Sequence, residues 1–249
     1  LWSLQPREAG GAPLHSRRLS GYSPKMTHFL YISDVFCPWC YGFAPVMHRL
    51  AAEHPEWPVR VLCGSLVEEP TTLQTMAAKS PTLRAFFERL AATTGQAVGE
   101  PFLRRLEPGE EDAPLFSPEM ATVLAAVNKL KPGCALETME AFQTAFYRDG
   151  INVLYPPVQP GVAGVDPDAL THVLHDPAIM AEAERESEEA LELLGDFVVY
   201  PTLWLVDGED RLLLSRGYSR YEAVASRLAA RRAGEASADA CGLDGACPL

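Results

Sequence analysis

The chain has 249 residues, of which 47% are hydrophobic, and its formal net charge is −12. The hydrophobic content is enough for a substantial core, and the negative charge argues against nucleic acid or an anionic membrane surface as a partner. No stretch reaches the roughly 18 consecutive apolar residues of a membrane span, and residues 1–25 lack the apolar segment of a secretory signal. We therefore expect a cytoplasmic protein in which residues 1–25 are a disordered or upstream extension.

The first predicted elements form a β-α-β unit. Residues 28–33 are mostly apolar and are typical of a buried strand, residues 38–54 have a helical period, and residues 59–63 alternate as a second strand. Such a unit is expected to be parallel and right-handed. Cys63, at the end of the second strand, is predicted to be a buried core thiol rather than a reactive one.

Residues 66–176 are predicted to form an inserted helical domain. Apolar residues recur at the helical period after Pro81, after Pro118 and from Leu136 to Phe146. Residues 107–114 are predicted to be an acidic loop and residues 155–164 a loop rich in proline and glycine. Helix N-caps are predicted at four residues that directly precede a proline. These residues are Ser80, Ser117, Asp166 and Asp176.

The chain then returns to an α-β-β-α order. The helix after Pro177 carries a run of glutamates that we interpret as a solvated face. Residues 201–206 and 211–215 flank a polar turn and are predicted to form a hairpin, and a last helix follows. Residues 26–65 and 177–233 are thus expected to form one domain. Residues 234–249 are expected to be a flexible tail that carries Cys241 and Cys247.

The sequence Cys37-Pro38-Trp39-Cys40 stands between the first predicted strand and the first helix. A strand that leads a Cys-x-x-Cys pair into a helix is typical of redox chemistry. Free N–H groups and the helix dipole at the N-terminus favour the thiolate of Cys37, and Pro38 suits the first helical position. We expect Cys37 to be an exposed nucleophile and Cys40, one turn further and facing inward, to be the resolving thiol.

Two other interpretations of the cysteine pair are less favoured. A structural zinc site needs four ligands, and the sequence has neither a second Cys-x-x-Cys pair nor histidines at the matching spacing. An inert structural disulfide usually closes a longer loop than this one. We therefore expect neither a metal nor a bound cofactor.

The segment from Ser33 to Pro45, which reads Ser-Asp-Val-Phe-Cys-Pro-Trp-Cys-Tyr-Gly-Phe-Ala-Pro, resembles the active-site segment of the DsbA family of thioredoxin-fold proteins. More narrowly, it is similar to the FrnE-like predicted dithiol-disulfide isomerases and their cytoplasmic relatives. The resemblance covers residues 27–233 and is strongest at this segment and at Tyr200-Pro201-Thr202. It implies an α/β protein with a thioredoxin fold that is interrupted by an all-helical insertion, the DsbA-like architecture.

The resemblance also assigns roles outside the first cysteine pair. Pro201 looks like the cis-proline that lies beside the active site in thioredoxin-fold proteins, although an ordinary trans-proline opening a strand is the alternative. Tyr200 stands where relatives usually have a small or β-branched residue, and its phenol is expected to tune the Cys37 thiolate or to narrow the peptide groove. Cys241 and Cys247 resemble the C-terminal cysteine pair of FrnE-like proteins and are a candidate second redox pair. Two incidental thiols in a tail are the alternative.

The expected function is that of a thiol-disulfide oxidoreductase or isomerase, whose reaction direction the sequence leaves open. Its partners would be protein or small-molecule thiols and disulfides, including glutathione or a thioredoxin-like reductant. Glutathione-dependent transferases and 2-hydroxychromene-2-carboxylate isomerases share the DsbA-like fold, but they typically have serine where Cys37 stands. A thiol chaperone that only binds its partners is a third interpretation.

Overall fold

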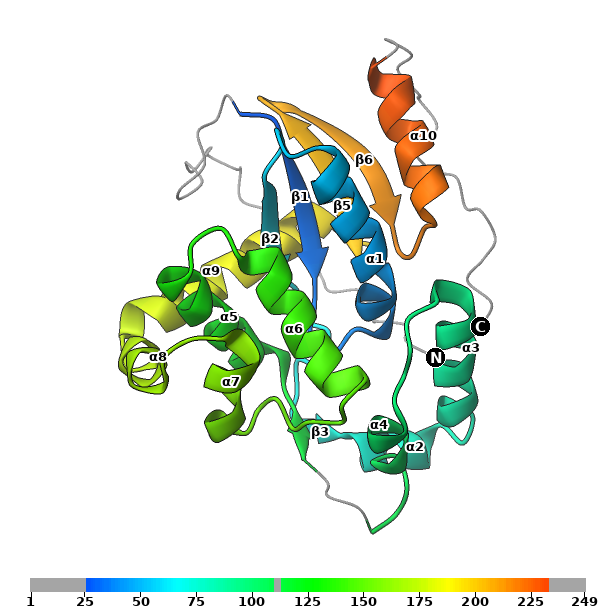
Figure 1. Cartoon of the computed structure of the whole chain (residues 1–249), viewed down its shortest axis with the longest axis vertical. Helices are drawn as coiled ribbons and strands as arrows, with labels where there is room; N and C mark the ends of the chain where they lie inside the picture. Colours follow the sequence, from blue (N-terminus) through cyan, green and yellow to red (C-terminus); the bar gives the residue numbers. More distant parts are fainter. Residues whose placement is uncertain (1–25, 110–112, 233–249) are drawn as a thin grey trace.

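The computed structural model describes residues 26–109 and 113–232 (Figure 1). The predictions for residues 1–25 and for the Cys241 and Cys247 pair lie outside the described residues. Among the residues that are described, no helix combines the length and the apolar character needed to cross a membrane.

A four-stranded mixed sheet with the strand order β2-β1-β5-β6 forms the centre of the fold. β1 (His28–Ser33) pairs in parallel with β2 (Val59–Cys63) and antiparallel with β5 (Thr202–Asp207). β6 (Asp210–Arg216) pairs antiparallel with β5 and completes the predicted hairpin. All of β1 is buried, because it lies between two strands and is covered on both faces, which explains its run of apolar residues.

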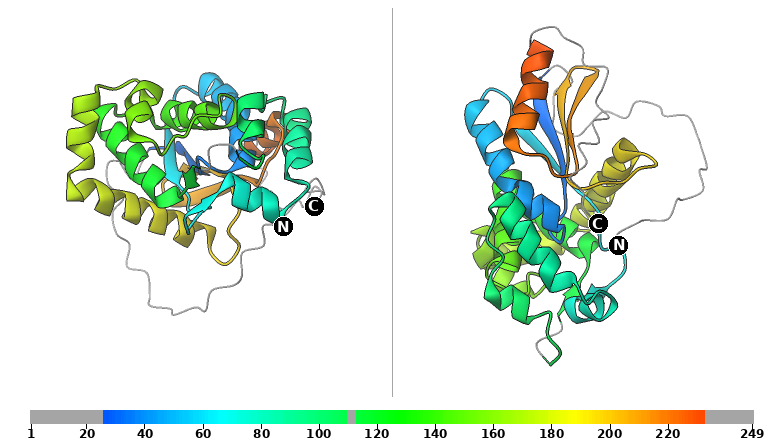
Figure 2. Two further views of the ribbon diagram at one scale, coloured as in Figure 1. Left: turned by 90° about the horizontal axis from the view of Figure 1, so that it is seen from below. Right: turned by 90° about the vertical axis from the view of Figure 1, so that its right-hand side faces the viewer.

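Helices cover both faces of the sheet. α1 (Pro38–Glu53) and α10 (Tyr221–Arg232) lie on one face, and α9 (Pro177–Leu194) lies on the other (Figure 2). Side chains of β1 alternate between the two layers. Phe29 and Tyr31 share a buried cluster with α1 and α10, whereas Leu30 and Ile32 share one with α9. The chain therefore has the predicted thioredoxin-like arrangement of α/β layers.

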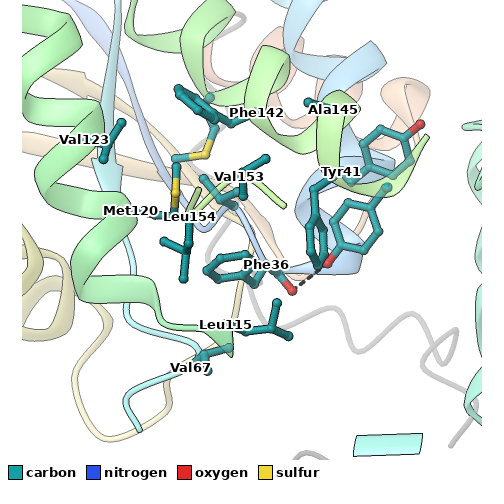
Figure 3. Close-up of a cluster of buried hydrophobic side chains, with 14 of the residues drawn as sticks. Phe36, Tyr41, Val67, Leu115, Met120, Val123, Phe142, Ala145, Val153 and Leu154 are labelled. Atoms are coloured by element: carbon teal, nitrogen blue, oxygen red, sulfur yellow. Dashed lines mark hydrogen bonds between the residues drawn. The ribbon is translucent and has the colours of Figure 1, made fainter. Parts of the chain in front are cut away.

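The segment between β2 and α9 contains most of the helices and lies mainly below the sheet in Figure 1. Its buried side chains form a large cluster that extends to Phe36 and Tyr41 beside the cysteine pair (Figure 3). Its elements, in chain order, are β3 (Thr71–Thr72), α2 (Leu73–Lys79), α3 (Leu83–Thr94), α4 (Glu100–Arg104), β4 (Pro114–Leu115), α5 (Ser117–Leu130), α6 (Ala135–Tyr147), η1 (Pro156–Val158), α7 (Gln159–Ala163) and α8 (Pro167–Leu174).

Two expectations for this segment are wrong. The segment is not entirely helical, because β3 and β4 pair antiparallel as a two-residue ladder. The predicted loop at residues 155–164 instead contains η1 and α7. Prolines stand in the first turn of both, where their fixed φ favours a helix, and Gly164 at φ 63° ends α7 in the left-handed region.

Two of the four predicted N-caps are confirmed and two are wrong. Asp166 and Asp176 accept hydrogen bonds from the N–H groups of Ala169 and Ala178 and cap α8 and α9 as predicted. Ser117 instead lies inside α5, and its hydroxyl accepts the N–H of Val67 from a distant loop at 3.0 Å. Ser80 is not an N-cap either, because α3 begins only at Leu83, after Thr82.

The acidic face of α9 is only partly solvated, which corrects the sequence-based interpretation. Glu189 accepts two hydrogen bonds of 2.6 Å from the guanidinium of Arg60 on β2, and this pair connects the helix to the edge of the sheet. Burial raises the pKa of Glu186 to about 7, and the nearby Glu182 and Glu189 add to the shift.

Candidate active site

Cys37 occupies the N-cap of α1, directly after the turn that follows β1. Its backbone is extended, with φ −85° and ψ 113°, and its Sγ accepts the N–H of Cys40 at 3.4 Å. Pro38 takes the first helical position, where a missing N–H removes no helix hydrogen bond. A sulfur that receives a helix N–H is positioned to carry negative charge.

Both cysteines are buried and have free thiol groups in this structure. Cys40 is 0% exposed, and burial is the main cause that raises the pKa of its thiol well above the usual value, with Cys37 as the next cause. Cys37 is only 3% exposed, so the expectation of an exposed nucleophile is wrong. The reason is tertiary, since Cys37 belongs to a buried cluster with side chains of α9 and with Tyr200.

Tyr200 contacts Cys37 through its main chain. The thiol of Cys37 donates a hydrogen bond of 3.8 Å to the carbonyl oxygen of Tyr200, and the Tyr200–Pro201 peptide bond is cis. The phenol of Tyr200 accepts the N–H of Ser65 at 3.1 Å, and its ring fills the space beside Gly64. Burial raises the pKa of this phenol. The segment before β5 thereby presents a backbone carbonyl to the cysteine pair.

Trp39, in the first turn of α1, contacts two segments that are distant from it in the sequence. Its ring packs edge-on against Phe86 of α3, with 5.9 Å between centroids, and at a tilt against Tyr218, with 5.6 Å between centroids. Tyr218 precedes α10, so residues from the inserted segment and from the end of the chain meet at the Cys-x-x-Cys turn.

Asp34 is a buried carboxyl group that the sequence analysis did not single out. It is 0% exposed, and it accepts the N–H groups of Phe36 at 2.8 Å and Leu66 at 3.1 Å. Burial nevertheless raises the pKa of Asp34 from 3.8 to about 6. A signal was present in the sequence, because an acidic residue directly follows a buried strand and precedes the cysteine pair by only three positions.

The inserted segment braces the turn between β1 and Cys37. Gln143 of α6 donates to the carbonyl oxygen of Asp34 at 3.0 Å. Tyr147, one turn later, donates to the carbonyl oxygen of Phe36 at 2.6 Å, and this bond is the dashed line at Phe36 in Figure 3. These bonds satisfy buried backbone carbonyls in a segment that belongs to no strand or helix. They hold the turn that presents Cys37 at the helix N-terminus.

The remaining described cysteines lie outside the Cys-x-x-Cys turn. Cys63 is buried at the end of β2 as predicted, and burial raises the pKa of its thiol. Cys134 is half-buried at the N-cap of α6. Within residues 26–109 and 113–232, no group of three His, Cys, Asp or Glu side chains is arranged to hold a metal ion.

No protein-family model and no curated protein matches the sequence, but solved structures are similar in fold. A proposed protein disulfide isomerase from Nitrosomonas europaea superimposes with a TM-score of 0.68 at 22% identity, over 84% of this chain and 99% of that one. The cytosolic disulfide reductase DsbM from Pseudomonas aeruginosa, in a structure with GSH, gives a TM-score of 0.60 at 22% identity over 76% and 89%. The chain has a DsbA-like thioredoxin fold. A 2-hydroxychromene-2-carboxylate isomerase is also similar, with a TM-score of 0.56 at 17% identity over 84% of this chain and 99% of that one.

Proposed function

We propose that this DsbA-like chain is a thiol-disulfide oxidoreductase in which Cys37 is the nucleophile and Cys40 the resolving thiol. The observation that carries the proposal is the N-cap geometry, in which the Cys37 sulfur accepts the N–H of Cys40 at 3.4 Å. The Cys37 thiolate attacks a disulfide, a mixed disulfide forms on Cys37, and Cys40 displaces the substrate thiolate. The raised pKa of Cys40 fits this division, because a protonated thiol does not compete in the first attack.

Pro38, Trp39, Tyr200 and Pro201 are proposed to support the reaction. Pro38 and Trp39 shape the first turn of α1, and Trp39 is held between Phe86 and Tyr218. The Tyr200 carbonyl is directed at the Cys37 thiol, so the segment before β5 is suited to align a substrate strand beside the reacting sulfur.

Glutathione or a thioredoxin-like protein is the proposed electron donor, and protein or small-molecule disulfides are the proposed substrates. The similarity to a cytosolic disulfide reductase whose structure was solved with GSH supports this choice. We propose the cytoplasm as the compartment on the same ground. No bound cofactor is needed, since the exchange occurs between sulfur atoms alone.

The test is insulin reduction with glutathione as the electron source, beside an assay of glutathione conjugation to an electrophile. We expect wild-type protein to reduce insulin and Cys37→Ser to be inactive. Cys40→Ser should accumulate a mixed disulfide on Cys37 that mass spectrometry detects, because no resolving thiol remains. Cys134→Ser serves as the control and should keep full activity. Conjugation without insulin reduction would instead support the transferase or isomerase interpretation.

The second redox pair stays a prediction from the sequence. If Cys241 and Cys247 exchange with the first pair, tethering places them at a millimolar effective concentration relative to Cys37. The double variant Cys40→Ser and Cys247→Ser should then accumulate an intramolecular Cys37–Cys241 bridge, to be identified by peptide mapping. Wild-type rates after removal of residues 236–249, with no trapped bridge, would contradict this prediction.

A further inference from the structure

Two buried polar atoms near the active site have no hydrogen-bond partner among the described residues: the hydroxyl of Tyr31 on β1 and Oε1 of Glu140 on α6. Leaving a buried polar group without a hydrogen bond destabilises the folded protein. Such groups are rare in folded proteins and call for an explanation, which is often an unseen water molecule or a role in catalysis.

The two atoms face the same part of the interior. Gln143 of α6 donates to the hydroxyl of Ser33 on β1 at 3.3 Å. Glu140 lies one turn before Gln143 on the same face of α6, and Tyr31 lies two residues before Ser33 on the same face of β1. The step from Gln143 back to Glu140 covers about 5 Å along α6, and the step from Ser33 back to Tyr31 covers about 7 Å along β1. Glu140 therefore lies level with Tyr31, and its carboxylate contributes to the raised pKa of that phenol.

Tyr31 also interacts with the cysteine pair. Negative charge on Cys40 is the largest cause after burial that raises the pKa of Tyr31. The Ser33 hydroxyl acts on both groups, because it offsets part of the rise in the pKa of Tyr31 and of Cys40. The Tyr31 hydroxyl thus lies in a polar region between the resolving thiol and Glu140.

Glu140 extends this polar region toward the surface. Its second oxygen, Oε2, contacts Nε2 of His48 on α1, and the His48 side chain is 62% exposed. The groups that can carry a proton therefore follow one another from the fully buried thiol to the solvent. In order, they are Cys40, Ser33, Tyr31, Glu140 and His48.

We propose that Glu140 accepts the proton that Cys40 loses when it resolves the mixed disulfide, with Ser33 and Tyr31 carrying the proton from Cys40 to Glu140 and His48 passing it to solvent. This inference rests on the proposed function. In the step itself, the Cys40 S–H bond breaks and a Cys37–Cys40 disulfide forms. The bond between Cys37 and the substrate sulfur breaks, and the substrate leaves as a thiolate with the electron pair. The protein thus releases one proton through His48 and one substrate thiolate, so its net charge does not change.

The proton affinity of Glu140 suits this task. Burial, together with the charge of Glu137, raises the pKa of Glu140 to about 8, and a group that titrates near the working pH is effective in proton transfer. The charged or titratable groups around Glu140 are His48 from α1, Tyr31 from β1 and Glu137 from α6. Glu140 also lines a groove between α6 and α7, together with Arg148 and Asp149 of the segment that ends α6. The residues that α7 contributes to this groove, Gly161 and Val162, are uncharged. Below about pH 8 Glu140 is protonated and accepts no proton, so resolution should accelerate as the pH rises through this value.

The test follows the reaction of reduced protein with the disulfide of 2-nitro-5-thiobenzoate, whose release gives an absorbance signal. Cys63 is replaced by alanine, and Cys134, Cys241 and Cys247 by serine, in every protein compared, so that the remaining signal comes from the active-site pair. A first phase reports attack by Cys37, and a second phase reports resolution by Cys40. In Glu140→Gln we expect an unchanged first phase, a second phase slower by roughly 10-fold or more above pH 8, where Glu140 is ionised in the wild type, and loss of the rate increase around pH 8.

Two further variants separate proton transfer from structure. Tyr31→Phe should show the same defect in the second phase, because it removes only the hydroxyl. Glu184→Gln makes the same charge change at an exposed position of α9, on the other face of the sheet, and should leave both phases unchanged. A wild-type second phase in Glu140→Gln and Tyr31→Phe, or a defect that does not vary with pH, would overturn the relay alone. Wild-type protein without any second phase would overturn the proposed function as well.

Discussion

Asp34 shows how one buried residue makes stability depend on pH. Its folded pKa of about 6 lies above its ordinary value of 3.8, so the folded protein binds a proton more tightly than the unfolded chain does. Protonation of Asp34 therefore adds to the free energy of unfolding. This contribution is fully present below the unfolded pKa of 3.8 and is lost as the pH rises through the folded pKa of about 6. The contribution amounts to about 3 kcal/mol, since each pKa unit corresponds to about 1.4 kcal/mol.

We therefore expect the stability of Asp34→Asn relative to wild type to increase by about 2 kcal/mol between pH 4 and pH 7, because part of the effect is already lost at pH 4. The absolute stability of the variant at low pH should be lower, because an amide nitrogen cannot accept the N–H of Leu66 that Asp34 Oδ2 accepts. Urea unfolding of both proteins across this pH range measures the difference. A difference that does not vary with pH would show that Asp34 does not titrate as described.

At the scale of elements, the start of α4 and the end of α6 pack backbone against backbone. The N–H of Gly99 donates to the carbonyl oxygen of Tyr147 at 2.9 Å. A Cβ at position 99 would lie 1.8 Å from the carbonyl oxygen of Arg148, and one at position 150 would lie 2.6 Å from Pro101. The inserted segment can brace the turn before Cys37 because these glycines let its helices approach so closely.

Gly99→Ala should destabilise the protein by about 3 kcal/mol or more, because the atom it meets is backbone and cannot move aside as a side chain would. Gly161→Ala is the matched control. No atom lies within 4 Å of its Cβ position in α7, so that replacement should stabilise the protein by up to roughly 1 kcal/mol through helix propensity. Guanidinium unfolding compares the two, and equal effects would contradict the close approach.

At the scale of the whole molecule, the core of the inserted segment and the sheet are continuous. One buried cluster contains Phe36 and Tyr41 beside the cysteine pair together with residues of α5 and α6. Tyr147 and Gln143 add hydrogen bonds across the same boundary. The division into two domains that the sequence suggests stays a prediction, but the contacts described here favour a single cooperative unit.

We expect one unfolding transition for both parts. The tryptophans of the described residues, Trp39, Trp57 and Trp204, all belong to the part that contains the sheet, whereas most helices lie in the inserted segment. Tryptophan fluorescence and far-ultraviolet circular dichroism should therefore report different parts but give the same midpoint in urea. Separate midpoints would show that the inserted segment unfolds independently.

Elements with local signals could be predicted from the amino-acid sequence. The apolar run of β1, the helical period of α1 and the aspartates before Pro167 and Pro177 predicted their elements correctly, since periodicity and capping depend on residues within one or two turns. The Cys-Pro-Trp-Cys turn was found in the same way, because both sulfurs and the helix N-terminus lie within four consecutive residues.

The groups that surround that turn come from distant parts of the chain and could not be predicted from local signals. The burial of Cys37, the direction of the Tyr200 carbonyl, the pairing of Ser117 with Val67 and of Glu189 with Arg60 all depend on residues that are far apart in the chain. Asp34 and Glu140 look like ordinary acidic residues in the sequence. Their pKa values rise because folding removes them from water, and that desolvation is a property of the packed molecule rather than of any stretch of the chain.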